Sequence, residues 1–515
     1  MDELALPDSL NIATAYVDAN VEAGRGDQTA ILYQDQEVSY AEVLENVNRT
    51  GNTLRDLGIG IEDRVALLLL DCPEFIYSFF GAIKIGAIAV PMNTFLRPSD
   101  YLYLINDSRA KSVIVSQALL PQIASIHDDL KYLRHVIVVG EAGNYLDFQA
   151  LLNNASSSLQ AEPLSQDDMA FWLYSSGSTG VPKGAVHLQH DMLYVSDLFG
   201  QQFMQMTAQD RTFSAAKLFF AYGLGNNMYM PMRVGASAVL LPDRPTPEAM
   251  FETISRYRPT IFYGVPTLYA QMLQVENASS RYDLSSLRLC LSAGESLPPE
   301  LYRRWKDRFG LDICDGIGST EALHIFIANR PDALRAGSTG KVVPGYEAKI
   351  VDEDGHELGV DTVGTLLVRG DSTSPFYWNK HRKTQQTMQG EWLNTGDKFS
   401  RDDEGYYWFA GRSDDMLKVG GIWVSPIEVE NAIVEHQAVL ETAVIGALDE
   451  DDLVKPKAYI MLRQGVTPSP ELEAELKDFV RNKIAHYKYP RWIEFVDDLP
   501  KTATGKIQRF KLREM

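Results

Sequence analysis

The sequence predicts an α/β protein with a large amino-terminal domain of stacked α/β sheets, a β-rich subdomain and a small mobile α+β domain at the carboxyl end. Three observations support this prediction. Short β-rich runs alternate with helical patterns early in the chain, closely spaced strands and turns follow beyond about Gly340, and a compact tail begins after Gly411. At 515 residues the chain is long enough for about three or four such units.

The alternation starts with helical patterns at residues 40–57 and 74–85, on either side of a β-rich run at 65–70. Further β-rich runs lie at 87–90, 112–115, 135–139 and 170–174. Strands that alternate with helices in this way are typical of a parallel sheet with crossover helices. We therefore expect an α/β core in the first part of the chain.

Beyond about Gly340 the pattern changes, and strands are expected at 347–351, 365–369 and 406–410. Asp-Gly and Glu-Gly turn signals separate them, which indicates a β-rich subdomain. In the tail, helical patterns at 425–435 and 472–484 alternate with further strands. We expect two domains of unequal size, 1–411 and 412–515.

The composition excludes several classes of partner. Lys and Arg number 48 against 69 Asp and Glu, so the net charge is -21 and a broad surface for nucleic acid or an anionic membrane is not expected. The three cysteines (Cys72, Cys290 and Cys314) are too few for a disulfide framework and include no C-x-x-C pair. Such a chain fits a reducing cytosol.

Neither the amino terminus nor the most apolar region of the chain indicates a secretory or membrane segment. The amino terminus is acidic and lacks the basic start and apolar run of a signal peptide. The most apolar region, residues 65–92, is interrupted by Asp71, Glu74 and Lys84 and is expected to form a strand, a helix and a strand. We expect a cytoplasmic protein.

A glycine-rich loop follows the β-rich run at 170–174. Its sequence from Tyr174 is Tyr-Ser-Ser-Gly-Ser-Thr-Gly-Val-Pro-Lys-Gly. Glycines let backbone N–H groups approach phosphate oxygens, while hydroxyls and a lysine supply further donors. A Walker loop is excluded because Lys183 is followed by Gly184 rather than by Ser or Thr. The expected phosphate-binding residues are Ser175, Ser176, Gly177, Ser178, Thr179, Gly180 and Lys183.

This loop resembles the phosphate loop of the adenylate-forming superfamily, which includes acyl- and aryl-CoA ligases, peptide-synthetase adenylation domains and firefly-type luciferases. Further segments resemble that family in the same order, over about residues 39–515. The resemblance implies that a carboxylic acid attacks the α-phosphorus of ATP, pyrophosphate leaves, and the thiol of coenzyme A then takes the acyl group and releases AMP. It implies ATP, Mg²⁺ and coenzyme A as cofactors and cosubstrate.

The segment from Asp315 to Glu321 resembles the family's second nucleotide segment. The resemblance implies that Thr320 binds phosphate and that the Glu321 carboxylate holds Mg²⁺. The family often has an aromatic residue where this chain has Ile317, so adenine is expected to lie between this aliphatic side chain and a wall that starts at Ala293. The other residues that the resemblance assigns to ATP here are Gly294, Glu295, Ser296, Asp315, Gly316 and Ser319.

Two later segments resemble those that bind ribose and join the domains. Asp397, in Trp-Leu-Asn-Thr-Gly-Asp, matches the aspartate that accepts hydrogen bonds from ribose hydroxyls, a task that suits an ionised carboxylate. Arg412 matches a second ribose contact, and Asp414 matches the hinge. The resemblance therefore implies that the small domain rotates at Asp414 between the two half-reactions.

Near the carboxyl end, Pro500-Lys-Thr-Ala-Thr-Gly-Lys506 resembles the loop that delivers the family's catalytic lysine. Lys506 is the lysine that matches, and it would place a cation beside the acid and the α-phosphate. Gly420 and Gly421 match the backbone that lines the pantetheine channel, where the absence of a side chain permits close approach. The resemblance thus places the acid and ATP sites in 1–411 and the catalytic lysine in 412–515.

The segments at 217–226 and 321–326 resemble the acid pocket of benzoate–CoA ligases. The residues that match are Ala221, Tyr222, Gly318, His324 and Ile325. Small, flat and apolar walls suit an aryl acid. Hydroxy-, amino- and halobenzoates and cyclic non-aromatic acids stay open as alternatives to benzoate, because one pocket substitution changes such a choice by only a few kcal/mol.

Several side chains in these segments also have a purely structural interpretation. Phe219, Phe220 and Phe326 are at least as well explained as core aromatics. His324 is either a polar group at the ring edge of the acid or a hydrogen-bonded buried histidine. The pair at 187 and 190 has a metal-like spacing, but no third ligand or zincin motif accompanies it, and we therefore do not predict a zinc site.

Other functions remain for comparison. A protein that loads an acyl group onto a carrier in trans would share the first half-reaction. A luciferase-like oxygenase is disfavoured because the chain ends in Lys-Leu-Arg-Glu-Met rather than Ser-Lys-Leu. A nicotinamide oxidoreductase would need a third glycine after Gly58-Ile-Gly60. A non-catalytic binding protein would not require Lys506. The resemblance allows a homodimer, and a monomer is equally compatible with the composition.

Overall fold

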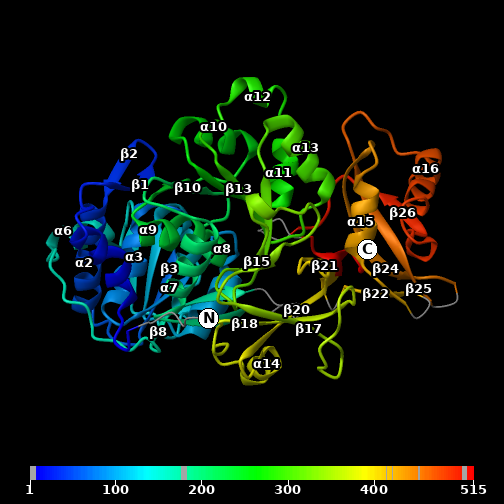
Figure 1. Cartoon of the computed structure of the whole chain (residues 1–515). Coiled ribbons are helices and arrows are strands. Elements are labelled where there is room, and N and C mark those ends of the chain that lie inside the picture. Colours follow the sequence, from blue (N-terminus) through cyan, green and yellow to red (C-terminus); the bar gives the residue numbers. More distant parts are fainter. Residues whose placement is uncertain (1–6, 176–181, 413–414, 420–421, 451–452, 502–506) are drawn as a thin grey trace.

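The structure is a computed structural model, and it describes residues 7–175, 182–412, 415–419, 422–450, 453–501 and 507–515. Within this part of the chain, the strands form sheets of nine, seven, five, three and two strands. The large amino-terminal part holds the nine- and seven-stranded sheets, and the last hundred or so residues form a separate lobe (Figure 1). The predicted α/β class with a β-rich subdomain and a small carboxyl-terminal domain is confirmed.

The seven-stranded sheet runs in the order β7-β6-β5-β3-β4-β8-β9. Its strands are parallel except for the last, because β9 pairs antiparallel with β8. The chain therefore reverses between Ser175 and Lys183, and the phosphate loop predicted there joins two adjacent strands. The strands are β3 (Arg64–Leu68), β4 (Ile88–Pro91), β5 (Ser112–Ser116), β6 (His135–Val139), β7 (Leu146–Asp147), β8 (Met169–Ser175) and β9 (Lys183–Leu188).

Short-range signals set where the first crossover helices begin. The Ser39 hydroxyl accepts from the Glu42 N–H at 3.2 Å, and the Glu42 carboxylate accepts from the Ser39 N–H at 2.7 Å, which starts α2 with a capping box. Pro73 occupies the first turn of α3, where its missing N–H has no cost. The helices beside this sheet are α1 (Ala19–Glu22), α2 (Tyr40–Asp56), α3 (Pro73–Lys84), α4 (Pro98–Ser108), α5 (Leu120–Ala124) and α6 (Phe148–Asn154).

The nine-stranded sheet runs in the order β16-β15-β14-β13-β12-β10-β11-β1-β2. Strands β10 to β14 are mutually parallel, so the carboxyl ends of β13 and β14 meet at one edge. Ligands bind at such edges in open α/β sheets. The strands are β1 (Thr29–Tyr33), β2 (Gln36–Ser39), β10 (Arg211–Ser214), β11 (Ser237–Leu240), β12 (Ile261–Gly264), β13 (Leu289–Ala293), β14 (Ile313–Gly318), β15 (Ile325–Ala328) and β16 (Lys341–Val342).

The helices of this second α/β layer form the green upper part of Figure 1 and the region between the two large sheets. The last four of them, from Pro247 to Phe309, pack a second core around Trp305 and Tyr269, whose rings meet edge to face at 4.8 Å. The helices are α7 (Asp191–Val195), α8 (Ala221–Leu224), α9 (Met230–Val234), α10 (Pro247–Tyr257), α11 (Pro266–Met272), α12 (Ala278–Arg281) and α13 (Pro299–Phe309).

The β-rich subdomain is a five-stranded antiparallel sheet. The strands predicted at 347–351, 365–369 and 406–410 correspond to β17, β18 and β21, whereas β20 was not predicted. Its elements are β17 (Glu347–Val351), β18 (Gly364–Arg369), α14 (His381–Thr387), β19 (Met388–Gln389), β20 (Trp392–Arg401) and β21 (Tyr407–Arg412).

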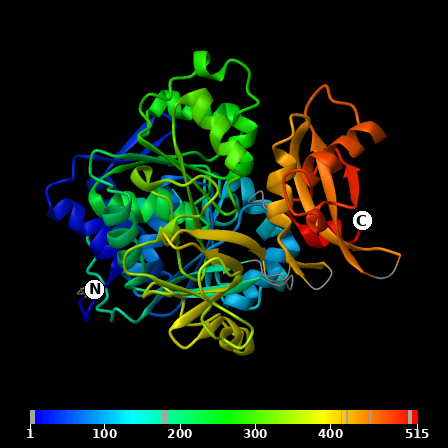
Figure 2. The ribbon, with the colours of Figure 1, turned by 45° about the vertical axis from the view of Figure 1, so that its right-hand side comes forward.

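The carboxyl-terminal lobe has a core of its own, in which Val429, Ile433 and Val480 are fully buried. Figure 2 shows this lobe beside the rest of the molecule. The helix predicted at 472–484 is observed at 470–481, because Ser469 caps its start and the chain leaves the helix at Asn482. The elements are β22 (Leu417–Val419), β23 (Ile422–Val424), α15 (Pro426–Val434), β24 (Val439–Leu448), β25 (Val454–Leu462), α16 (Pro470–Arg481), β26 (Trp492–Phe495) and α17 (Arg509–Leu512).

In the described part of the chain, no helix combines the length and the apolar character that crossing a bilayer requires.

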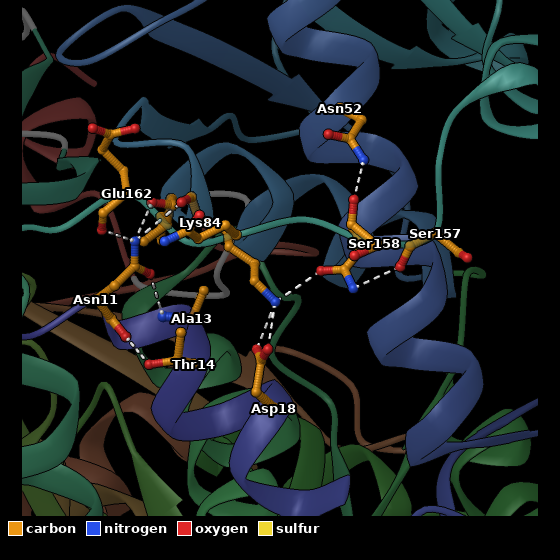
Figure 3. A network of polar contacts seen from close by, with 12 residues as sticks. Asn11, Ala13, Thr14, Asp18, Asn52, Lys84, Ser157, Ser158 and Glu162 are labelled. Carbon is orange, nitrogen blue, oxygen red and sulfur yellow. Dashed lines mark hydrogen bonds and ion pairs between the residues drawn. The ribbon is translucent and has the colours of Figure 1, made fainter. Parts of the chain in front are cut away.

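A buried lysine joins the first helices of the chain. Lys84, at the end of α3, is fully buried, and its ammonium donates to both oxygens of Asp18 at 2.6 and 2.7 Å and to Asn48 Oδ1 at 2.8 Å (Figure 3). Asn11 donates to the Lys84 carbonyl at 3.1 Å and to the Glu162 carbonyl at 3.1 Å. The charge is thus paired and hydrogen-bonded, as a buried ammonium must be.

Replacing Lys84 with alanine is expected to destabilise the protein by about 3–5 kcal/mol, because the variant leaves the Asp18 carboxylate without its cation. Arg55→Ala is the control, since Arg55 and Glu162 form a pair that is about one-third exposed and worth at most about 1 kcal/mol. The measurement is thermal unfolding of both variants beside the parent chain. Equal losses in the two variants would show that the buried pair has no special weight.

Candidate active site

A cavity of about 1060 Å³ lies between the two α/β layers, the β-rich subdomain and the carboxyl-terminal lobe. Residues from all four regions line it, among them Pro91, Asp315, Thr395 and Glu430. The predicted nucleotide residues that line this one cavity are Ser175, Lys183, Gly294, Glu295, Ser296, Asp315, Gly316, Ile317, Ser319, Thr320, Glu321, Asp397 and Arg412. Segments that are more than two hundred residues apart in the sequence thus meet here.

The remaining predicted residues of the phosphate loop, the hinge, the pantetheine channel and the catalytic loop lie outside the described residues. They are Ser176, Gly177, Ser178, Thr179, Gly180, Asp414, Gly420, Gly421 and Lys506. The described neighbours of Lys506 on its carboxyl side, Ile507 to Phe510, line the cavity.

Glu321 lies in the loop between β14 and β15, at the edge where the carboxyl ends of the parallel strands meet. Its Oε1 accepts from the Tyr377 hydroxyl at 2.6 Å and from the Ser175 hydroxyl at 3.2 Å. Burial, and then the charge of Glu321, raises the pKa of Tyr377, so this phenol stays protonated and donates to the carboxylate. Tyr377 thereby orients Glu321 toward the cavity.

Lys183 completes this group of charged and polar side chains. Its ammonium lies 4.4 Å from the centre of the Tyr377 ring and 3.4 Å from the hydroxyl. Burial lowers the pKa of Lys183, and the nearby Glu321 carboxylate partly offsets this effect. A cation, a carboxylate and two hydroxyls therefore face one part of the cavity, which is the donor set expected for phosphate and a hard metal ion.

The residues present fit Mg²⁺. This ion takes oxygen ligands and is usually held in proteins by one or two carboxylates together with substrate phosphates. Glu321 supplies such a carboxylate, and its Oε1 is held by two hydroxyl groups rather than by a salt bridge to Lys183.

A second group of residues that line the cavity has a different character. Asp315 is buried, and no donor among the described residues reaches its Oδ1. Burial raises the pKa of Asp315 well above its usual range. Asp397 and Arg412 are register partners on β20 and β21, and their side chains bond at 2.9 Å. The buried Asp315 acceptor suits the base of a nucleotide, and the acceptor–donor pair of Asp397 and Arg412 suits its sugar.

The predicted acid-pocket residues are adjacent but mostly buried behind the cavity wall. Gly318 lines the cavity, and a side chain there would meet the carbonyl oxygen of His324 at 2.3 Å. The rings of Tyr222 and His324 lie 5.7 Å apart, and His324 is buried with Ala221 and Ile325, whereas Tyr222 is partly buried. Residues 221–222 and 324–325, although a hundred positions apart, therefore come together beside Gly318.

The environment of His324 is that of a hydrogen-bonded buried histidine, which is the second of the two interpretations given above. Its ring is buried and shares a hydrogen bond of 3.1 Å with Asn226 Oδ1, so Nε2 carries the proton because an amide oxygen only accepts. Burial lowers the pKa of His324 to about 3, which makes the imidazole neutral at pH 7.

Three cavity-lining aromatics were not assigned from the sequence. Phe219 and Phe220 line the cavity, although a role in the core explained them equally well from sequence alone. No sequence pattern assigned Tyr377 to the site. The only local signal is the aromatic run Phe376-Tyr377-Trp378 in an otherwise polar stretch, and such a run does not indicate which distant carboxylate it meets.

Comparisons with known proteins agree with this geometry. The chain is 51% identical over 512 residues to a benzoate–CoA ligase of Thauera aromatica, which covers 99% of this chain and 97% of that protein. It is 44% identical over 508 residues to a 4-hydroxybenzoate–CoA/benzoate–CoA ligase of Rhodopseudomonas palustris, covering 98% and 94% of the two chains.

Solved structures agree as well. A crystal structure of an anthranilate–CoA ligase in complex with anthranoyl-AMP matches with a TM-score of 0.96 at 47% identity, over 100% of this chain and 98% of that one. A benzoate–CoA ligase from Burkholderia xenovorans LB400 matches with a TM-score of 0.91 at 44% identity, over 98% and 99%.

The family comparison covers both parts of the chain. Residues 17–378 match the AMP-binding enzyme family, and residues 428–506 match the AMP-binding enzyme C-terminal domain. The resemblance to adenylate-forming enzymes is thereby confirmed, and the chain belongs to the AMP-binding enzyme family.

Proposed function

We propose that this chain is an ATP-dependent acid–CoA ligase that activates benzoate or a close aryl acid through an acyl-adenylate. The observation that supports this most is the single cavity that Lys183, Thr320 and Glu321 line together with Asp315, Asp397 and Arg412. The identity of 51% with a benzoate–CoA ligase over nearly the whole chain supports the same reaction.

A carboxylate resists attack by a thiol because it is anionic and has no good leaving group. Its attack on the α-phosphorus of ATP forms the mixed anhydride and expels pyrophosphate, with charge building on the phosphate oxygens. We assign Lys183, Thr320 and Lys506 to stabilising that charge and Glu321 to holding Mg²⁺, which supplies further charge stabilisation when bound. The thiol of coenzyme A then attacks the acyl carbonyl, AMP leaves, and the thioester forms.

The base and the ribose are assigned to the second group of cavity-lining residues. The buried Oδ1 of Asp315 has no donor among the described residues and suits the exocyclic amino group of adenine. Asp397 suits a ribose hydroxyl as an acceptor, and Arg412 donates to its Oδ1. Ile317 lines the cavity and offers the aliphatic face against which the base would lie.

The two halves of the chain receive different tasks in this proposal. Residues 1–411 hold the acid and ATP sites, and residues 412–515 form the mobile domain with Lys506 and the hinge Asp414. The separate core of the carboxyl-terminal lobe supports its movement as a unit. After adenylation the lobe would turn at Asp414 and bring Gly420 and Gly421 to the pantetheine channel.

We infer an aryl acid as the substrate. Phe219, Phe220 and Gly318 line the cavity, and Tyr222 and His324 pack beside Gly318, so the wall is flat and leaves little room for a long chain. Because His324 is neutral, this wall carries no charge that would favour a second carboxylate on the ring. Relatives named for benzoate, 4-hydroxybenzoate and anthranilate support a monocyclic aryl acid.

The test offers benzoate, substituted benzoates, cyclohexanecarboxylate and short fatty acids to the purified protein with ATP, Mg²⁺ and coenzyme A, and detects products by mass. Benzoyl-CoA, AMP and pyrophosphate in equal amounts are expected. An aroyl-AMP without thioester would indicate a carrier protein as the acceptor. No product from any aryl acid would refute the substrate class, and no pyrophosphate from any acid would refute the ligase itself.

A further inference from the structure

A buried histidine outside the proposed reaction contacts the loop that carries Thr320 and Glu321. His187 lies on β9 and is fully buried, with its ring stacked on Phe171 at 5.2 Å. Its Nε2 lies 2.8 Å from the carbonyl oxygen of Thr320, and its Nδ1 lies 2.7 Å from Asp191 Oδ2. The sequence drew attention to this histidine only through its spacing from His190, and neither ring is available as the start of a metal site.

Donor and acceptor chemistry determines the direction of the bond between His187 and Thr320. A carbonyl oxygen only accepts, so Nε2 of His187 donates to Thr320. Asp191 Oδ2 also accepts the N–H of Leu188 at 3.2 Å. The bond of 2.7 Å between Nδ1 and Asp191 Oδ2 holds the ring in the orientation that directs Nε2 at the Thr320 carbonyl.

The bond from His187 reaches the peptide group that joins Thr320 and Glu321. The Thr320 carbonyl belongs to the peptide between Thr320 and Glu321, so its direction sets ψ of the first residue and φ of the second. The same carbonyl accepts from the Leu323 N–H at 3.2 Å, in a tight turn where Leu323 has a φ of 66°. A leucine in the left-handed region costs of order 1 kcal/mol or more and persists only where surrounding contacts hold it.

The next two carbonyls of this turn are held from another segment. The Glu321 carbonyl accepts from the Ser374 N–H at 2.7 Å, and the Ala322 carbonyl accepts from the Ser372 hydroxyl at 2.8 Å. The His190 ring also contacts main-chain carbonyls, since its nitrogens lie 3.0 Å from that of Gln166 and 2.9 Å from that of Asp371. Three consecutive carbonyls, from Thr320 to Ala322, are therefore each bonded from outside the turn.

We propose that His187, oriented by Asp191, is a positioning residue that fixes the Thr320–Glu321 peptide and so directs the two side chains toward the nucleotide and the metal ion. This inference rests on the proposed function, because the value of the geometry lies in adenylation. The bond spans 133 residues and comes from the strand that follows the phosphate loop, so one contact couples the two phosphate-binding segments.

A matched pair of variants separates the two ring nitrogens. In His187→Gln the side-chain amide can reach the position of Nε2 and donate to Thr320, whereas in His187→Asn the amide reaches only the position of Nδ1 and faces Asp191. We expect His187→Asn to lower the rate of adenylation about 10–100-fold and to raise the Mg²⁺ concentration at half-maximal rate, and His187→Gln to restore most of both. Adenylation is followed by aryl-acid-dependent exchange of pyrophosphate into ATP.

Two controls distinguish positioning from a general loss of structure. Thioester formation from preformed benzoyl-AMP and coenzyme A should change by no more than about twofold in either variant, since it needs neither pyrophosphate nor Mg²⁺. His135 also bonds a main-chain carbonyl, that of Leu57 at 2.9 Å, on a strand distant from the cavity, so His135→Asn should leave adenylation unchanged. Equal losses in His187→Asn and His187→Gln, or an equal fall in the thioester step, would overturn the proposal.

Binding supplies a readout that does not depend on turnover. Calorimetric titration with ATP and Mg²⁺ together, and with ATP alone, should show that His187→Asn weakens binding about tenfold or more only when Mg²⁺ is present. An unchanged Mg²⁺-dependent affinity would refute the positioning role even if the protein made no acyl-CoA. Absence of aryl-acid-dependent exchange in the parent chain would refute the proposed function instead.

Discussion

Lys506→Ala is expected to lose acyl-adenylate formation by at least about a hundredfold and to keep thioester formation from a preformed adenylate. Removing one positioned charge or donor from a transition state that builds negative charge typically costs about 10²–10³ in rate. In the second half-reaction the lobe has turned in the proposed mechanism and Lys506 has left the site, so the charge that AMP takes up as it leaves does not depend on this ammonium. The measurement compares aryl-acid-dependent pyrophosphate exchange with release of benzoyl-CoA from benzoyl-AMP in the same preparation.

Lys477→Ala is the matched control for this variant. Lys477 lies in the same lobe on α16, where it pairs with Glu473 one turn away, and such surface pairs contribute less than about 1 kcal/mol. We expect its two half-reactions to match those of the parent chain. If Lys506→Ala kept its adenylation rate, the assignment of the catalytic lysine would be wrong, and a non-catalytic binding role for this loop would gain support.

Glu321→Gln is expected to lower adenylation by about 10²–10³-fold and to raise the Mg²⁺ concentration that half-maximal rate requires. The amide oxygen of glutamine can still accept from Tyr377 and Ser175, so both hydrogen bonds and the fold should survive. What the variant lacks is the negative charge that a hard cation prefers in its ligands. Mg²⁺ titrations of the exchange rate measure the effect.

Glu347→Gln provides the comparison for the loss of one carboxylate. Glu347 pairs with Arg369 on the half-exposed face of the β-rich sheet, away from the cavity lining, and its replacement should leave the Mg²⁺ dependence unchanged. A Glu321→Gln variant with the parent's Mg²⁺ dependence would argue that Glu321 holds a structural hydrogen bond to Tyr377 and does not bind the metal.

Much of the fold was predictable because its signals are local. The capping box at Ser39 and the proline at position 73 specify where two helices begin, and each acts over at most four residues. The parallel strands at 65–70 and 87–90 follow from β-rich runs separated by a helix. The end of the helix predicted at 472–484 was wrong by three residues, because helix termination there depends on packing rather than on a strong stop signal.

The candidate site was predictable in part, for a different reason. The glycine-rich loop and the segment from 315 to 321 were recognised as resemblances, and composition alone would have left both as turns. Their meeting with Asp397 and Arg412 in one cavity could be expected from that resemblance, but not from the local sequence. The roles of all these residues stay proposals, and several of the residues, Lys506 among them, lie outside the described part of the chain.

The sequence by itself determined the α/β class, the β-rich subdomain and the small carboxyl-terminal domain, since propensities, caps and turn signals act within a few residues, and its resemblance to a family indicated the segments to which the chemistry is assigned. Only the tertiary structure decided that Tyr377 bonds Glu321 across 56 positions, that His187 bonds Thr320 across 133, and that Tyr222 and His324 share one wall. Such contacts depend on how the sheets pack, and no local pattern specifies which distant partner a buried polar group will meet.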